Sequence, residues 1–392
     1  MFLFYNTLSG QHFTISPKEF LASVVEKLQD IDNGYCVELS ESELTLKEIK
    51  DFVRSLRANY CGDIIAQKLT KMKPFSLYPT LSVMKNREIQ KSDTYLSMGE
   101  RILNFLHVLT VQITGICDLK YQTNLEAYKQ ILSCSYSDNE LDYEVIESIF
   151  KQISGCNFGS INIIGGDIFR YSEWKKLMLL LHQYAFRYYF FTDYRLLPFN
   201  EKKLQELVSL SSCLHVTVSG EFEESVLKKA IHIIPDMDSE VIFQITSEEQ
   251  FLAAKTFCEN NQIENCSSQP VYTGSNLDFF RNFIFMDETS IVETPVSKQT
   301  IYANMTLNAS DFGKITIVSS GDVYANLNFP KLGNIKTDSI RDLLFHELYK
   351  GDSWFRIRDQ KPCSECIYQW LCSPPSNYEL CIGQPNLCHI KK

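Results

Sequence analysis

The sequence has no excess of positive charge, because 38 Lys and Arg stand against 48 Asp and Glu for a net charge of −10. A nucleic-acid-binding protein normally shows a basic face, so we expect no nucleic-acid partner. A long apolar run is missing as well. The start, Met1–Asn6, is apolar over too few residues for a signal peptide, and no segment reaches the length of a membrane span. We therefore expect a cytoplasmic protein with no membrane partner.

A nucleophile motif is also missing. Five histidines invite a catalytic interpretation, but none has a Ser or Cys nucleophile motif beside it: His107, His182, His215, His232 and His389. We interpret each as a hydrogen-bonded polar residue. His389, next to Cys388, is an alternative metal ligand.

Cysteine, by contrast, is abundant, with thirteen residues. Without a secretory signal, this many cysteines indicates reduced thiols and metal ligation rather than a disulfide framework. Four scattered cysteines are interpreted as small buried apolar residues: Cys36, Cys61, Cys213 and Cys258.

The strongest pattern lies near the C-terminus, which contains Cys363-Ser-Glu-Cys366, Cys372, Cys381 and Cys388. Two residues between cysteines make a tight turn that directs both sulfurs toward one point. Adding Cys372 and one later cysteine completes a four-thiolate cage, which suits either an iron–sulfur cluster or structural zinc.

The chain divides into three zones joined by one linker. In the first, residues 1–75, two strand-like runs meet at Ser9-Gly10 and predict a hairpin of Phe2–Thr7 and His12–Ser16. A helix beginning at Pro17, a strand at Tyr35–Leu39 and a helix over Leu46–Tyr60 follow. This order predicts a small α+β, winged-helix-like domain. Residues 76–99 are the expected linker.

The second zone, residues 100–295, alternates strands with helices. The expected strands are His107–Thr114, Ser160–Gly165, Arg187–Thr192, Leu214–Ser219, Val241–Thr246 and Ser268–Thr273. The expected helices are Tyr143–Ile153, Ser172–Tyr184, Lys202–Leu210, Glu223–His232, Glu248–Asn260 and Asn276–Phe285. Such units predict an α/β fold with a parallel sheet, and six of them are too few for an eight-fold barrel. We expect a partial (β/α)6 TIM-like barrel, with function at the C-terminal ends of its strands.

The third zone, residues 296–392, opens with a predicted strand pair, Lys314–Val318 and Asp322–Ala325, and ends in the cysteine-rich tail. Two turns in the second zone complete the pattern: Cys117 follows the first strand, and Gly165-Gly166-Asp167 ends the second. Together with the tail cysteines, these motifs resemble radical SAM enzymes with a SPASM domain, over about residues 100–392. The resemblance implies a C-terminal SPASM-type metal-binding domain.

The chain departs from this family at its reactive cluster. The family needs three thiolates at CxxxCxxC, and the matching positions here are Cys117, Tyr121 and Asn124. Phenol and amide groups are poor ligands for soft iron, so we expect no radical chemistry and no S-adenosylmethionine cofactor. Cys134 and Cys156 are not expected to rebuild the cluster. Gly165, Gly166 and Asp167 could still form a vestigial S-adenosylmethionine site, or simply a tight turn.

The tail departs in a consistent way. The family's Gx4C motif would run from Gly321 to Asn326, and the position four after Cys372 is Ser376. The family's cysteines at these positions serve a first auxiliary cluster. The ligands of a second cluster are all matched: Cys363, Cys366, Cys372 and Cys388. The resemblance therefore implies one retained [4Fe–4S] cluster, with zinc as the alternative. Cys381 is a spare thiol or a replacement for Cys388.

The first zone loosely resembles the RiPP recognition element, which binds a leader peptide as an added strand; a structural cap on the barrel is the alternative. The whole resembles the pseudo-radical-SAM proteins of Bacteroidales-type systems, whose precursors carry a Gly-Gly leader. This implies a pseudo-enzyme that binds a ribosomal precursor (leader) peptide, an active radical SAM maturase, or both. The rivals are an active iron–sulfur peptide-modifying enzyme that uses the auxiliary cluster, and a zinc-stapled scaffold.

Overall fold

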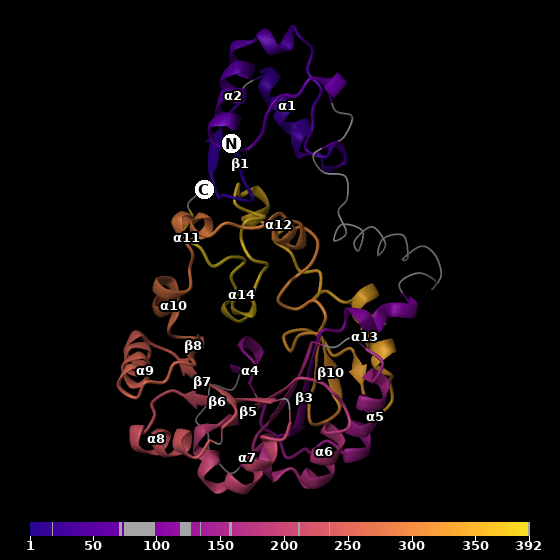
Figure 1. The fold of residues 1–392 in the computed structure, drawn as a ribbon, viewed down its shortest axis with the longest axis vertical. Coiled ribbons are helices and arrows are strands. Elements are labelled where there is room, and N and C mark those ends of the chain that lie inside the picture. Colours follow the sequence, from indigo (N-terminus) through magenta and orange to yellow (C-terminus); the bar gives the residue numbers. More distant parts are fainter. Residues whose placement is uncertain are drawn as a thin grey trace.

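The computed structural model describes residues 1–17, 19–69, 73, 99–117, 127–133, 135–156, 159–210, 212–234 and 236–390. It is a mixed α/β structure with one large sheet and a separate two-stranded sheet. Figure 1 shows the N-terminal unit above the body that contains the large sheet. The expected linker lies outside the described residues except for Gly99, where a 3-10 turn begins.

The N-terminal unit opens with the predicted hairpin, in which β1 (Phe2–Tyr5) pairs antiparallel with β2 (His12–Ile15). The turn contains Gly10 at φ +75°, a backbone conformation that favours glycine. The two predicted helices are confirmed as α1 (Glu19–Gln29) and α2 (Lys47–Ala58).

The predicted strand at Tyr35–Leu39 is wrong, because this described segment is not a strand. Gly34 and Tyr35 both have positive φ, 60° and 57°, so the chain turns where the strand should begin. The β1–β2 sheet also gains no third strand among the described residues.

The N-terminal unit has its own hydrophobic core, separate from that of the large sheet. Its buried members are Leu21, Val24, Val25, Ile49 and Phe52. They come from the apolar faces of α1 and α2, as the helical spacing predicts. The sheet packs on them through Phe4, whose ring lies 5.0 Å from that of Phe52.

The large sheet has nine strands in the order β11-β10-β9-β3-β4-β5-β6-β7-β8. All neighbours from β9 to β8 are parallel. The six predicted strands are confirmed with ends shifted by a few residues: β3 (Val108–Thr114), β4 (Ser160–Gly165), β5 (Tyr188–Asp193), β6 (Ser212–Ser219), β7 (Asp238–Ile245) and β8 (Cys266–Pro270). The hydrogen-bonded order has two ends, so the described strands form no closed ring.

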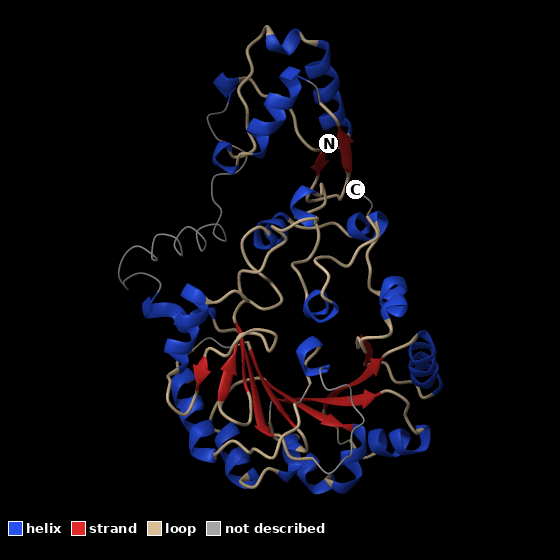
Figure 2. Ribbon diagram, turned by 180° about the vertical axis from the view of Figure 1, so that it is seen from behind, coloured by secondary structure: helices blue, strands red, loops and turns tan. Residues whose placement is uncertain are grey.

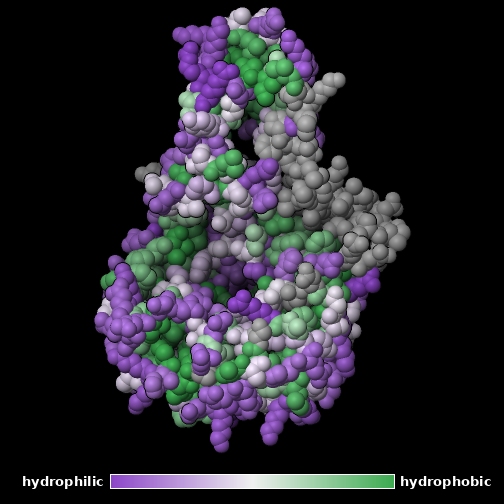
Figure 3. Space-filling model, in the orientation of Figure 1, coloured by the Kyte–Doolittle hydropathy of each residue, from purple (hydrophilic) through white to green (hydrophobic). Residues whose placement is uncertain are grey.

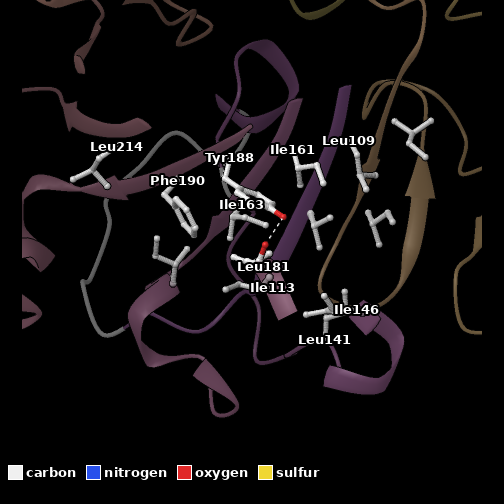
Figure 4. Packing of buried hydrophobic residues seen from close by; sticks show 14 of the residues in the cluster. Leu109, Ile113, Leu141, Ile146, Ile161, Ile163, Leu181, Tyr188, Phe190 and Leu214 are labelled. Carbon is white, nitrogen blue, oxygen red and sulfur yellow. Dashed lines mark hydrogen bonds between the residues drawn. The ribbon is translucent and has the colours of Figure 1, made fainter. Parts of the chain in front are cut away.

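The predicted helices between these strands are also confirmed: α5 (Tyr143–Ile153), α6 (Trp174–Leu181), α7 (Glu201–Leu207), α8 (Glu224–His232), α9 (Glu248–Asn260) and α10 (Leu277–Phe283). Figure 2 shows helices along the outer side of the curved sheet. Alternate strand residues, such as Leu109, Ile163 and Phe190, face these helices and are fully buried (Figure 4). In the same layer, the Tyr188 hydroxyl of β5 donates to the Leu181 carbonyl at the end of α6, at 3.0 Å.

The third zone contains the predicted antiparallel pair, β9 (Lys314–Ile317) and β10 (Asp322–Tyr324), followed by β11 (Gly333–Asn334). The sequence did not predict that β9 also pairs in parallel with β3, which joins this zone to the large sheet. Its helices are α12 (Lys298–Asn304), α13 (Ile340–Lys350) and α14 (Asn377–Ile382), whereas α11 (Glu288–Glu293) ends the second zone.

The inner side of the sheet is covered by α14 and by α4 (Ala127–Gln130), as Figure 1 shows. Tyr378 of α14 donates its hydroxyl to the carbonyl of Pro270 at the end of β8, at 2.8 Å. Asn328 donates to the carbonyl of Lys129 in α4, at 2.7 Å. The tail therefore lies over the C-terminal ends of the strands. Figure 3 shows a hollow in the body, below the N-terminal unit, with hydrophilic residues in it.

The N-terminal unit contacts the body just before α12 and within it. The amide of Val296 donates to the Tyr5 hydroxyl at 2.8 Å, and the side chains of Tyr302 and Tyr35 are hydrogen-bonded. Within the described part of the chain, no helix has the length and apolarity needed to cross a membrane.

Candidate metal centre

The first two predicted ligands lie in a tight turn, as their spacing predicts. Cys363 begins a 3-10 turn, Cys363–Glu365, and the amide of Cys366 donates to the carbonyl of Cys363 at 3.0 Å. Cys372 follows in a second turn, where its amide donates to the Tyr368 carbonyl at 3.1 Å. These turns keep the three cysteines on one short stretch of chain.

Cys388 reaches the same region from the end of the chain. Its segment runs beside Met286, which donates its amide to Leu387 at 3.1 Å and accepts from His389 at 2.9 Å. Cys372 is fixed from another side, because the Asn304 side chain donates to its carbonyl at 3.0 Å. Contacts far apart in sequence therefore position both residues.

The four predicted ligands lie in one neighbourhood, which we call the thiol cluster (Cys363, Cys366, Cys372 and Cys388). Burial raises the pKa of Cys372 to about 12, and the thiols of Cys366, Cys388 and Cys363 add to the rise, whereas the Arg358 guanidinium opposes it. Such effects weaken with distance, so these groups must be close to Cys372.

Cys381 points elsewhere, since its sulfur lies 3.7 Å from the side-chain oxygen of Asn328. The ring of His389, the other alternative ligand, is hydrogen-bonded to the Arg281 carbonyl at 2.8 Å.

Two nitrogen donors approach the sulfurs of the thiol cluster. Arg358 Nη1 lies 3.7 Å from the sulfur of Cys363, and Asn386 Nδ2 lies 3.0 Å from that of Cys388. N–H groups of this kind support thiolate ligands in metal sites. The donor set fits tetrahedral zinc or an iron–sulfur cluster in its chemistry. No three His, Cys, Asp or Glu side chains in the described ranges are spaced to hold a metal ion, so these side chains must adjust to bind one.

A second cluster includes Asn377 of α14, and we call it the Asp311 network (Asp311, Asn326, Ser353, Arg356 and Asn377). The Asp311 carboxylate accepts from Asn326 at 3.0 Å, from Ser353 at 3.0 Å and from Arg356 at 3.3 Å. Asn326 also donates to Asn377 at 2.6 Å. The side chain of Asn326, where the family pattern expects a cysteine, is therefore hydrogen-bonded on two sides.

Ser376, the other position where the resemblance expects a cysteine, caps α14. Its side chain accepts from the Tyr378 amide, and the Glu379 side chain accepts from the Ser376 amide at 2.7 Å, which makes a capping box.

The sequence analysis missed the residues that surround Asn326 and Ser376: Asp311, Ser353, Arg356 and Arg358. The only signal was two arginines, Arg356 and Arg358, shortly before the first tail cysteine.

The Gly165-Gly166-Asp167 motif ends β4 in a tight turn against the end of β3. The amide of Gly166 donates to Thr114 at 3.0 Å, and that of Asp167 donates to Ile116 at 2.8 Å. A Cβ at Gly166 would lie 2.3 Å from the Ile116 oxygen, so the turn requires glycine. Asp167 is buried, and its carboxylate accepts from the Phe169 amide at 3.1 Å.

The predicted reactive-cluster loop is only partly visible. Cys117 lies at the end of a described segment and is partly buried, whereas Tyr121, Asn124 and Cys134 lie outside the described residues. Cys156 is partly buried, and burial raises the pKa of its thiol.

The scattered cysteines do not all match the expected burial. Cys213 and Cys258 are buried, but Cys61 is only partly buried and Cys36 is exposed, so the interpretation of Cys36 as a buried residue is wrong. Cys36 lies in the irregular segment that replaces the predicted strand, and its neighbours Val37 and Leu39 pack on the N-terminal core instead.

Burial lowers the pKa of His215 in β6. Its Nδ1 lies 3.0 Å from Glu240 of β7, which opposes the effect, and its ring stacks on Phe191 at 4.5 Å. Neither ring nitrogen has an aligned hydrogen-bond partner within the described structure. His182, by contrast, is hydrogen-bonded through both ring nitrogens, as expected.

No family model matches the chain, and no curated protein matches it either. The similar solved structures include three crystal structures of SuiB from Streptococcus suis. SuiB itself aligns with TM-score 0.49 and 14% identity, covering 99% of this chain and 96% of SuiB. SuiB bound to precursor peptide SuiA and SuiB bound to S-adenosylmethionine each align with TM-score 0.48 and 13% identity, covering 99% of this chain and 95% of SuiB.

Proposed function

We propose that the chain is a catalytically degenerate relative of radical SAM/SPASM proteins that acts in ribosomal peptide modification. It binds a precursor (leader) peptide, an active radical SAM maturase, or both. One [4Fe–4S] cluster, held by the thiol cluster, has a structural role. The observation that carries this proposal is a contrast: three other tail thiols act on Cys372, whereas only Cys117 is a cysteine among the three reactive-cluster positions.

The proposed domains are a peptide-binding domain at 1–75, a linker at 76–99, a degenerate partial barrel at 100–295 and a SPASM-like domain at 296–392. The separate hydrophobic core of α1 and α2 supports an independent N-terminal domain. The six consecutive parallel strands with intervening helices support the partial barrel.

A peptide would bind the N-terminal domain as an added strand. The β1–β2 sheet pairs with no further described strand, so its outer edges have backbone groups available for a peptide in extended conformation. The contacts of Tyr5 and Tyr35 with the body would hold this sheet above the hollow in Figure 3.

The role of the thiol cluster is to join three segments of chain. A bound metal would connect the turn at Cys363, the turn at Cys372 and the end of the chain at Cys388, and metal–thiolate bonds would add their free energy to folding. Zinc is the second candidate, because four thiolates also satisfy tetrahedral zinc. With zinc, the chain would be a stapled scaffold.

The loss of catalysis is tested with anaerobically reconstituted, reduced protein and S-adenosylmethionine. We expect no 5′-deoxyadenosine, while an intact radical SAM enzyme assayed in parallel produces it. Formation of 5′-deoxyadenosine above the background of the Cys363→Ala/Cys366→Ala variant would establish the rival, an active enzyme.

Peptide binding is tested by fluorescence anisotropy with a labelled leader peptide of the Gly-Gly class. We expect saturable binding to the full chain and equal binding to the Cys363→Ala/Cys366→Ala variant. If the double variant loses binding, the division of labour between tail and N-terminal domain is wrong.

A further inference from the structure

Arg358 is a buried cation beside the thiol cluster. Its side chain is 8% exposed, and each of its guanidinium nitrogens has a partner. Nε donates to the Ser373 carbonyl at 2.5 Å, Nη2 donates to Glu379 at 2.9 Å, and Nη1 lies 3.7 Å from the sulfur of Cys363. One side chain therefore contacts both the thiol cluster and Glu379, the partner of Ser376 in the capping box of α14.

The position of Arg358 is fixed by partners outside the thiol cluster. Glu379 is 5% exposed and is itself held by the Ser376 amide at 2.7 Å. A buried ion pair is costly to desolvate and persists where the remaining donors and acceptors are satisfied, as they are here. The guanidinium is thus oriented toward Cys363 without a bound metal.

A four-thiolate metal site has a net negative charge, because a zinc ion or a [4Fe–4S] core compensates only part of the charge of its ligands. A cation held nearby in a buried environment stabilises that charge more strongly than it would in water. N–H donors to ligand sulfurs act in the same direction. Arg358 offers both effects at one ligand.

We infer that Arg358 is a positioning residue for the metal of the thiol cluster: its guanidinium compensates the charge of the four-thiolate site and donates a hydrogen bond to Cys363. This rests on the proposed metal centre. Arg356 provides a matched comparison, because it is two residues away and partly buried but bonds to Asp311 and to the Ser376 carbonyl.

The test is a zinc titration of the full-length apo protein against a competing chelator at fixed pH. We expect Arg358→Gln to weaken the zinc affinity about 10–100-fold, the range found when residues that hydrogen-bond to metal ligands are replaced. Arg358→Lys keeps the charge and loses less, and Arg356→Gln binds as the wild type does. Equal affinity of Arg358→Gln and wild type, or equal losses in Arg358→Gln and Arg356→Gln, would overturn the inference.

A second readout is the midpoint potential of the iron-loaded protein, which a merely structural role would not move. A nearby cation favours the reduced, more negative site, so Arg358→Gln should lower the potential. If Arg358→Gln fails to fold, Arg358→Lys keeps the charge but loses the hydrogen bond from Nη1 to Cys363, so it should bind zinc more weakly than the wild type; unchanged zinc affinity would count against Arg358. Wild-type protein that binds neither zinc nor iron would overturn the metal centre itself.

Discussion

The thiol cluster and the Asp311 network both hold the tail on the body, but they are built from opposite materials. The Asp311 network pairs a carboxylate with a guanidinium, an amide and a hydroxyl, so the charge of the carboxylate is compensated within the chain. The thiol cluster consists of four like groups, and burial and the other three thiols raise the pKa of Cys372. The charge of the Asp311 carboxylate is compensated without a bound metal, whereas the thiol cluster is stabilised by binding a metal cation. We therefore expect only one half of the tail to depend on metal.

The comparison bears on how a metal site can be lost. Asn326 and Ser376 stand where the resemblance expects cysteines of a first auxiliary cluster. The first now belongs to a hydrogen-bond network, and the second caps a helix. We propose that these buried hydrogen bonds hold together the segments of the tail that a first auxiliary cluster would otherwise join.

The largest effect should follow removal of the thiol cluster's metal, by chelation or by Cys363→Ala/Cys366→Ala. Metal binding by structural sites reaches about 10 kcal/mol, and part of this free energy appears as stability of the tail. Limited proteolysis should then cut the chain after residue 350 much faster. The control is Cys381→Ala, which removes a tail thiol outside the cluster and should protect as well as wild type. Equal susceptibility of the two variants would contradict the assignment of ligands.

Breaking the Asp311 network should cost somewhat less. Asp311→Ala leaves Arg356 without its carboxylate, and loss of one partner from a buried pair typically costs about 3–5 kcal/mol of unfolding free energy. Denaturant unfolding with and without chelator measures this loss. We expect the same loss in both conditions, because the network does not use the metal. A loss that disappears in the metal-free protein would show that the two clusters are one unit.

The smallest effect is a pH dependence that lies in the sheet and outside both tail clusters. Burial lowers the pKa of His215 in the folded protein below its ordinary value of 6.5. Below about pH 6.5 the unfolded chain binds more protons than the folded one, so stability should fall as the pH falls through this range. His215→Gln should flatten the fall in unfolding free energy measured between pH 7 and pH 5. Identical slopes for wild type and variant would show that His215 does not contribute.

Much of the fold could be predicted because its signals are local. The bounds of α5 and α9 match the prediction, since each has helical spacing and α9 begins at Ser247, which caps it. The prediction of a strand at Tyr35–Leu39 was wrong because the local sequence indicated neither the turn at Gly34 nor the lack of a described strand with which this segment could pair. The pairing of β9 with β3 joins residues about two hundred positions apart, which no local pattern records.

The candidate site was predictable to the same extent. The spacing of Cys363, Cys366 and Cys372 indicated a shared site, and the fold brings Cys388 to it along Met286. The partners of these residues were not predictable, because Asp311 and Arg358 act through side chains that meet only in the folded tail. The direction of Cys381, left open by spacing alone, follows from its contact with Asn328.

The most direct test of the central claim is the iron, sulfide and zinc content of the anaerobically purified and reconstituted protein. The account predicts about four irons with matching sulfide per chain, as one [4Fe–4S] cluster requires, and loss of this iron in Cys363→Ala/Cys366→Ala but not in Cys381→Ala. Colourless protein with one zinc per chain would contradict the cluster, and iron retained by the double variant would contradict the ligands.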